Sequence, residues 1–389
     1  MAPILPSISK ALAIPDLYQG TLVSAYALFA GMCALVMGPI SDKIGRRRIL
    51  IFGTGAMSVF LFLHILAYDY YSLLIARALA GVAGGMLTGV STAYVGDYFP
   101  SEKRGWANGW VMTGIAAGQV MGIPLGTLLT DWYGYYAPFV FFAGPMSISF
   151  VVTIVAVPQP VVNRSQERLT IAGAAATYYE MLTTRPTSYA SAAYAMMFVS
   201  IAFYVIYLFT WLESTFGAAG SDIATLFMVG GVASVAVGPI AGRFSDRFGR
   251  KAVIFWACVG SAILMAATTT LMVSFWVAYP IFFFSMVLMA ARMGPFQAMM
   301  SEVVPDERRG SMMSMSIALG QVAMGIGGGI AGLAYTEYGY FSSTILGAGS
   351  MLAMGFLVWF GIPETRPQTP RGKTAGLIDG NTPSGGSAT

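Results

Sequence analysis

Long apolar segments alternate with short polar ones along most of the chain. A membrane-crossing helix needs about 20 mostly apolar residues, and each apolar segment here is about that long. A segment in contact with lipid has to satisfy its own backbone hydrogen bonds, so each one is expected to be helical. The pattern predicts eleven spans, at about 18–40, 49–67, 72–98, 105–129, 136–157, 188–215, 222–244, 252–271, 275–303, 310–336 and 340–362.

The composition agrees with a protein embedded in a lipid bilayer. Hydrophobic residues make up 56% of the chain and charged residues 10%, whereas about 25% of the residues in a soluble domain are charged. So few polar side chains do not cover the surface of a water-soluble globule. The chain is therefore predicted to be a polytopic, all-α membrane protein.

Lysine and arginine gather in alternate loops. They occur at 43–48, 103–104, 164–185, 243–251, 308–309 and 366–373, whereas the loops near 68–71, 131–136, 216–221 and 337–340 contain none. Short basic loops stay in the cytoplasm. The basic loops, the long loop in the middle and the C-terminal tail are therefore predicted to be cytoplasmic, in a cytoplasmic (inner) membrane. The net charge of +4 needs no nucleic-acid partner to explain it.

The chain repeats itself at an offset of 204 or 205 residues. GPISDKIGRRR at 38–48 corresponds to GRFSDRFGRK at 242–251, and FPSEKRG at 99–105 corresponds to VPDERRG at 304–310. The repeat predicts an N-terminal bundle over 1–157, a linker over 158–187 and a C-terminal six-helix bundle over 188–362. A short surface helix is expected at about 168–184. The Pro/Gly/Ser/Thr-rich tail, 363–389, is expected to be disordered.

The two halves differ at their first helix. The second half has six spans, whereas the first shows only five complete ones. The repeat places the partner of the helix at 188–215 before residue 1, so that MAPILPSISK is its last few turns. We interpret the chain as a twelve-span fold with its first helix truncated. A natural eleven-span protein with an external N-terminus is the alternative.

The repeated stretch has the pattern G-x-x-x-D-x-x-G-R-[RK], and a second motif is RALAGVAGG at 77–85. Both resemble motifs of the major facilitator superfamily. The third, GIAAGQVMGIPLG at 114–126, is similar to a Gly/Pro motif of the drug:proton antiporter branch, with Ile123 inserted before its proline. The residues that carry the first motif and its echo are Gly38, Asp42, Gly45, Arg46, Arg47 and Gly242, Asp246, Gly249, Arg250, and those of the third are Gly114, Gly118, Gly122, Pro124 and Gly126.

The resemblance implies a two-bundle secondary active transporter that works by alternating access. Its expected activity is proton-coupled efflux of a small organic compound, as in multidrug antiporters, by a monomer without a cofactor. An organic-anion exchanger or uniporter is the nearest alternative, and a non-transporting membrane sensor is a remote one. No enzymatic activity is expected, since no nucleophile–base or metal-ligand constellation occurs in the sequence.

The resemblance also implies an inner gate built from the repeated motif. Asp42, Arg46 and Asp97 would form one ion-pair cluster, and Asp246, Arg250 and Glu302 its counterpart. Arginine suits this role because it pairs with carboxylates bidentately. The alternative is that these arginines only set the topology of the chain.

Two arginines lie inside predicted spans, where a charge usually has a function. Arg77 and Arg292 are candidates for coupling. For Arg77 the alternative is snorkelling to the interface, and for Arg292 it is a structural pair. Other candidates for the substrate cavity, alongside Arg292, are Gln119, Tyr204, Tyr207, Trp211 and Gln321. No acid lies at mid-membrane, so the sequence does not identify the carboxylate that carries a proton.

Overall fold

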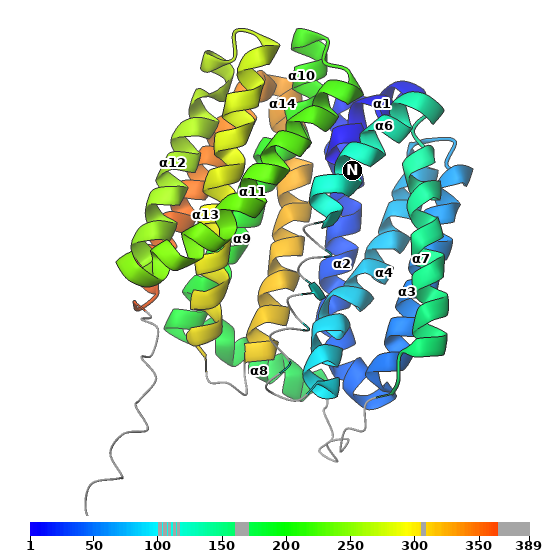
Figure 1. The fold of residues 1–389 in the computed structure, drawn as a ribbon, viewed down its shortest axis with the longest axis vertical. Coiled ribbons are helices and arrows are strands. Elements are labelled where there is room, and N and C mark those ends of the chain that lie inside the picture. The colour runs from blue at the N-terminus through cyan, green and yellow to red at the C-terminus, as the bar shows by residue number, and fades with distance from the viewer. Residues whose placement is uncertain are drawn as a thin grey trace, which may run out of the picture.

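Helices arranged as two side-by-side bundles make up the computed structural model of the protein (Figure 1). The structure describes residues 1–99, 103, 107, 110, 111, 114, 117–159, 171–304 and 309–364. The first bundle contains α2 (Asp16–Ile44), α3 (Arg46–Leu63), α4 (Tyr70–Tyr98), α6 (Ile123–Tyr133) and α7 (Ala137–Ala156). The second contains α9 (Arg185–Ile206), α10 (Leu208–Phe216), α11 (Gly220–Phe248), α12 (Arg250–Leu271), α13 (Ala278–Glu302) and α14 (Arg309–Gly361).

Nine helical segments of the described chain are long and apolar enough to cross a membrane. One of them, Ser311–Gly361, holds two helices, because Gly339 has non-helical angles (φ 70°, ψ −177°). The two spans expected at 310–336 and 340–362 are therefore both present. Most of the first half of the span expected at 105–129 lies outside the described residues, as do the tail beyond 364 and residues 160–170 of the linker. The expected all-α membrane fold is confirmed.

The helix expected at 188–215 is interrupted. It begins earlier, at Arg185, and α9 gives way to α10 at Tyr207. The linker helix α8 (Ile171–Thr183) lies close to its expected position, at one end of the molecule. Residues of MAPILPSISK form η1 (Ala2–Ile4) and α1 (Leu5–Ala11), which lie at the other end near α6 and α10 (Figure 1). We call these the linker end and the opposite end.

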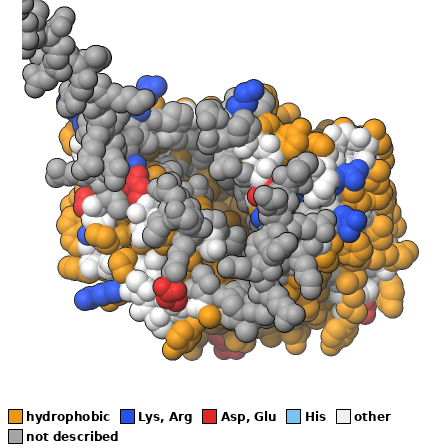
Figure 2. All heavy atoms as spheres, turned by 90° about the horizontal axis from the view of Figure 1, so that it is seen from below, with side chains coloured by type: hydrophobic (Ala, Val, Ile, Leu, Met, Phe, Trp, Pro, Cys, Tyr) orange, Lys and Arg blue, Asp and Glu red, His pale blue; other side chains and the backbone are white. Residues whose placement is uncertain are grey.

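The two ends and the sides of the molecule differ in their side chains. Figure 2 looks onto the linker end, where lysine, arginine and acidic side chains are visible, with hydrophobic side chains around them. Large apolar residues are exposed along the bundles, for example Phe52, Ile148 and Trp256. A soluble monomer rarely exposes so much contiguous apolar surface, so these sides are the surfaces that face lipid.

Local signals in the sequence set the helix boundaries. Asp69 precedes α4 and accepts the backbone N–H of Ser72 at 2.8 Å, while the hydroxyl of Ser72 lies 3.1 Å from the N–H of Asp69. This reciprocal capping box satisfies donors that the first turn of a helix leaves open. The hydrogen bonds from Ser72 hold the pKa of the Asp69 carboxyl below its usual value.

Candidate functional site

The repeated motif forms the same tight turn in both bundles. Gly45 between α2 and α3 has φ 106°, and Gly249 between α11 and α12 has φ 98°. Glycine adopts such angles without the steric cost that a side chain imposes. Each turn places an arginine, Arg46 or Arg250, at the first position of the next helix. The glycine of the motif therefore fixes where its arginine lies.

Each of these arginines pairs with an acid on a neighbouring helix of its own bundle. Arg46 Nε contacts Asp97 Oδ2 at the end of α4, and Arg46 Nη1 donates to Ser41 Oγ at 3.0 Å. Arg250 Nη1 lies 2.5 Å from Glu302 Oε2 at the end of α13. Both pairs are partly buried, where ion pairs are screened less than in water. They join the linker-end termini of helices within one bundle and do not bridge the two bundles.

Arg47 and Glu364 extend these two clusters to further helix termini. Arg47 Nε donates to the Val157 carbonyl at 2.5 Å and Arg47 Nη2 to the Ile154 carbonyl at 2.6 Å, so Arg47 caps the end of α7. Glu364 Oε1 accepts the backbone N–H of Arg250 at 2.9 Å and caps the start of α12. Sequence reasoning missed Glu364. The signal was available, since Pro158-Gln159 and Pro363-Glu364 are 205 residues apart.

For several of the predicted residues the structure describes only the position of the backbone. Gly38 and Asp42 lie in the last turns of α2, Asp246 in the last turns of α11, and Gln119 in the π-helix η3 (Gly118–Gly122). The side chains of Asp42, Asp246 and Gln119 lie outside what the structure describes. Gly122 and Gly126 face the ring of Phe142 on α7, and Pro124 is buried. The described part of the Gly/Pro motif thus packs α6 against its own bundle.

Arg77 is buried between α4 and α2. Its guanidinium lies 4.7 Å from the centre of the Tyr26 ring, and its Nε donates to the Leu22 carbonyl at 3.4 Å. A cation over an aromatic face is stabilised most when both groups are removed from water. Arg77 therefore lies within the first bundle and holds α4 to α2, rather than reaching the membrane surface.

Arg292 is buried within the second bundle, with 3% of its surface exposed. Its Nη1 donates to Ser261 Oγ on α12 at 3.0 Å. The contact joins α13 to α12. The side chain thus lies inside its own bundle and does not face the interface with the first bundle.

The three aromatic residues proposed for a cavity have different surroundings. Tyr204 contacts Thr268 Oγ1 at 3.0 Å through its hydroxyl, and the ring of Trp211 stacks on Tyr340 at 4.9 Å, so both pack within the second bundle. Tyr207 instead reaches across to α2, where its hydroxyl accepts the N–H of Gly20 and donates to the carbonyl of Asp16, both at 2.9 Å. It is a contact between the two bundles.

Small residues bring α2 and α14 together from the opposite end to the middle of the helices. A methyl group in place of the hydrogen of Gly20 would fall well inside 3.0 Å of the Gly328 carbonyl oxygen. One on Gly332 would meet the Leu17 carbonyl in the same way, and one on Gly31 would lie 2.7 Å from the Ala318 carbonyl. Gln321 packs beside Gly31 in this interface. Glycines allow such close approach of helices in membranes, and the cluster at 325–332 was the sequence signal for it.

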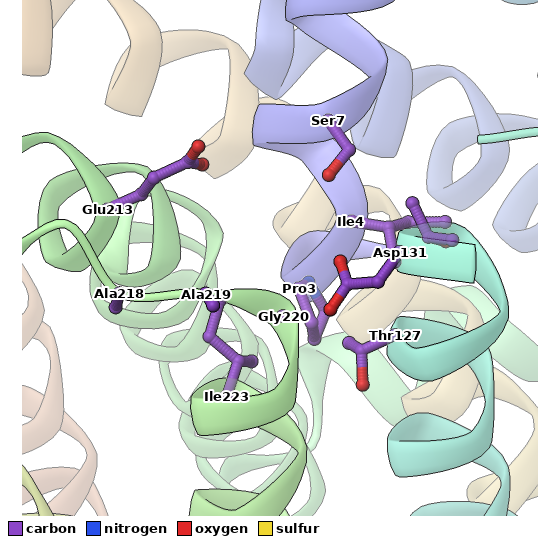
Figure 3. Close-up of a pocket in the computed structure, with 11 residues that line it drawn as sticks. Pro3, Ile4, Ser7, Thr127, Asp131, Glu213, Ala218, Ala219, Gly220 and Ile223 are labelled. Atoms are coloured by element: carbon purple, nitrogen blue, oxygen red, sulfur yellow. The ribbon is translucent and has the colours of Figure 1, made fainter. Parts of the chain in front are cut away.

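Polar contacts reinforce this closed end. Lys10 on α1 pairs with Glu213 on α10, and Asp131 at the end of α6 accepts the backbone N–H of Ser221 at the start of α11. The loops at this end contain no lysine or arginine, so the charge pattern did not predict a basic residue such as Lys10 here. A cavity of about 250 Å³ lies here, with Ser7, Thr127, Asp131 and Glu213 among its lining residues (Figure 3). Partial burial is the largest cause that raises the pKa of the Asp131 carboxyl, and the negative charges of Glu213 and Asp222 add to it.

Along α11 the described contacts with the first bundle end before the linker end. Helices η3 and α11 touch at mid-depth, where a methyl group on Gly231 would lie 2.9 Å from Val120. Farther toward the linker end, a methyl group on Gly114, Gly118, Gly238 or Gly242 would have nothing within 4 Å of it among the described residues. The described contacts of α11 with the first bundle therefore lie on the side of Gly231 away from α8.

Two repeated helical bundles with apolar outer surfaces, a matched motif at the linker end and an interface closed at one end define a membrane transporter. The family model described as Major Facilitator Superfamily matches residues 1–217 and 190–383. The chain belongs to this superfamily, as its motifs led us to expect. It is a multi-pass membrane transporter and not an enzyme.

Curated relatives include transporters of the same family. The chain is 25% identical over 354 residues to the uncharacterized MFS-type transporter YceJ of Bacillus subtilis (strain 168), covering 88% of this chain and 86% of that protein. It is 34% identical over 157 residues, 39% of each chain, to the multidrug resistance protein MdtG of Proteus mirabilis (strain HI4320). With MdtG of Escherichia fergusonii the identity is 26% over 281 residues, covering 68% of this chain and 66% of that protein.

Solved structures share the fold at low sequence identity. A D-xylose-proton symporter superposes with a TM-score of 0.74 at 16% identity, covering 93% of each chain. The human organic anion transporter MFSD10 (TETRAN) gives 0.70 at 17% identity, covering 90% of this chain and 87% of that one. At such identities the likeness concerns the fold alone.

Proposed function

We propose that this protein exports small, partly apolar organic compounds in exchange for protons by alternating access. The observation that carries the proposal is the uneven distribution of the described contacts between the bundles: the backbones meet at Gly20 and Gly328, whereas on α11 a methyl group on Gly238 or Gly242 would meet no described atom within 4 Å. A carrier that rocks two bundles about a central site has such a state at one stage of its cycle. The relatives named multidrug resistance proteins support efflux of organic compounds as the activity.

In this proposal the linker end faces the cytoplasm of the cell's inner membrane. The basic loops and α8 lie at that end, which agrees with the positive-inside rule. The described state then has its central space open to the cytoplasm and its outer end closed. The monomer is the working unit, and a gradient rather than a bound cofactor drives transport.

The repeated ion pairs have a mechanical role in this account. Arg46 with Asp97 and Arg250 with Glu302 hold together the cytoplasmic termini of neighbouring helices in one bundle. A bundle reinforced in this way moves as one body, and its terminal groups are presented in a fixed arrangement when the inner end closes. Asp42 and Asp246 are proposed members of these clusters.

Organic-anion exchange is the second candidate. The contacts of Arg77 and Arg292 favour it, because these two buried cations contact the neutral groups of Leu22, Tyr26 and Ser261. Both arginines lie inside their bundles, however, and this placement favours the first proposal.

Transport by purified protein in sealed vesicles tests the two functions against each other. The vesicles carry an imposed proton gradient, and a panel of cationic, neutral and anionic compounds is supplied on one side. Accumulation of apolar cations or neutral compounds that collapses with a protonophore supports proton-coupled export. Accumulation that ignores the proton gradient but requires an anion on the far side would establish anion exchange in its place.

A further inference from the structure

The hydroxyl of Tyr207 forms hydrogen bonds with the backbone of α2, a helix of the other bundle. It accepts the N–H of Gly20 and donates to the carbonyl of Asp16, each at 2.9 Å, and its side chain is fully buried. In an uninterrupted α-helix the N–H of residue 20 and the carbonyl of residue 16 bond to each other. The tyrosine hydroxyl thus lies within hydrogen-bond distance of both groups that this bond joins at the start of α2.

Neighbouring side chains hold the same turn of α2. Thr210, which lies one helical turn beyond Tyr207, donates to Gln19 Oε1 at 2.7 Å. Gln19 Nε2 in turn donates to the Asp16 carboxylate at 2.7 Å. The second bundle therefore contacts this turn through two hydroxyls. That of Tyr207 binds the backbone of α2, and that of Thr210 binds the buried side chain of Gln19.

The first helix of α14 also contacts Tyr207. The ring of Tyr207 stacks on Tyr335 with 4.6 Å between ring centres, and Gly332 leaves room beside the Tyr207 hydroxyl. The close approach of Gly20 to Gly328 brings α2 near enough for the hydroxyl to reach its backbone. The break between α9 and α10 falls at the residue that makes this contact.

We propose that Tyr207 is a latch of the outer end. When the bundles separate there, its hydroxyl withdraws from the N–H of Gly20 and the carbonyl of Asp16, which stay paired within α2, a helix that begins at Asp16. The inference rests on alternating access as proposed above, and it identifies the residue whose hydrogen bonds to the other bundle are lost in that step.

This arrangement keeps the free-energy cost of opening low. An unpaired backbone group in the membrane is costly, so an interface closed by backbone contacts would be hard to open if those groups lost all their partners. Here the groups of α2 remain paired within their own helix when the tyrosine leaves. The two hydrogen bonds of the Tyr207 hydroxyl and the packing of the glycine interface are what oppose opening.

Distances between spin labels test the latch directly. Tyr71 at the start of α4 and Tyr338 near the kink of α14 lie at the opposite end, one in each bundle, and are 70% and 78% exposed. The labels go on Tyr71→Cys and Tyr338→Cys in a background with Cys33→Ala and Cys258→Ala. Tyr207→Phe is compared with Tyr204→Phe, a matched control that loses a hydroxyl contact to Thr268 within the second bundle.

The loss of roughly one net hydrogen bond from the closed state predicts a rise of about tenfold in the ratio of long to short distances in Tyr207→Phe. Tyr204→Phe is expected to match the parent protein. Gly20→Ala, which blocks the close approach to Gly328, serves as a second variant that forces the long distance. The proposal is overturned if Tyr207→Phe keeps the parental distribution while Gly20→Ala lengthens it, and equally if both variants stay at the short distance.

The same variants separate this proposal from the proposed function. Transport in vesicles is measured alongside the distances. A parent protein that transports no compound under any gradient would refute the transport proposal, whereas the distance populations would still decide whether Tyr207 holds the outer end closed.

Discussion

Gly20 on α2 lies against the carbonyl of Gly328 on α14, with no room for a methyl group between them. The two residues belong to different bundles, so their contact exists only while the outer end is closed. Because the backbones themselves meet, this interface is sensitive to the smallest change in side-chain volume.

Gly20→Ala is predicted to shift the protein strongly toward the state with its outer end open. The added methyl group clashes with backbone, which cannot move aside as a flexible side chain does. Transport is expected to fall at least tenfold, with normal insertion into the membrane. Gly329→Ala is the matched control, since a methyl group there has open space. Equal transport by the two variants would show that this contact does not limit the cycle.

The ion pair between Arg46 and Asp97 is predicted to stabilise the linker end of the first bundle. Asp97→Asn leaves a partly buried arginine without its carboxylate, and a charge-assisted hydrogen bond contributes about 2 kcal/mol. We expect a lower thermal midpoint in detergent and reduced transport. The exchange Arg46→Asp with Asp97→Arg restores opposite charges and is expected to recover part of the stability. A double exchange no better than the single variant would argue against a direct pair.

Asp131 is predicted to make closure of the outer end depend on pH. Its carboxyl faces Glu213, Asp222 and the N-terminus of α11, with Lys10 paired to Glu213 nearby. In the closed state its pKa is raised above the usual 3.8, so the closed state binds the proton more tightly than an open state with a solvated carboxyl. Protonation therefore favours closure, and this advantage is lost as the pH rises through the raised pKa.

The label pair at residues 71 and 338 measures this dependence. The fraction of the short distance is expected to increase as the pH falls through the raised pKa of Asp131, and Asp131→Asn is expected to remove most of the pH response. A pH response of the same size in Asp131→Asn would assign the effect to another group.

Arg292→Ala is predicted to lower the stability of the second bundle without a change in KM for the transported compound. The side chain contacts Ser261 inside its own bundle, so its loss leaves a buried gap rather than an empty substrate contact. Ser261→Ala is expected to have a smaller effect in the same direction. A large rise in KM with unchanged stability would instead place Arg292 in the substrate site.

Much of the architecture could be predicted from the sequence because lipid imposes simple rules on it. Apolar length indicated the spans, and the repeat indicated the two bundles. The motif glycines also indicated the turns at Gly45 and Gly249, since their positive φ is a local requirement. The partners of Arg46 and Arg250 could be chosen because an acid recurs at the same place in both halves.

Contacts between the halves were harder to predict, because they obey no short-range pattern. The bridge from Tyr207 to Gly20 joins residues 187 positions apart and depends on a helix break that the apolar run at 188–215 conceals. The spacing of Tyr204, Tyr207 and Trp211 suggested one shared surface. The break separates them, so Tyr207 alone reaches the other bundle.

The central claim is that the two ends of the molecule open in turn. A second label pair, Arg48→Cys and Arg247→Cys, places exposed sites of the two bundles at the linker end, to be measured in parallel with the pair at residues 71 and 338. Across pH, added substrate and the Gly20→Ala change, the account predicts that one distance shortens whenever the other lengthens. Two distances that stay constant, or that change in the same direction, would contradict it.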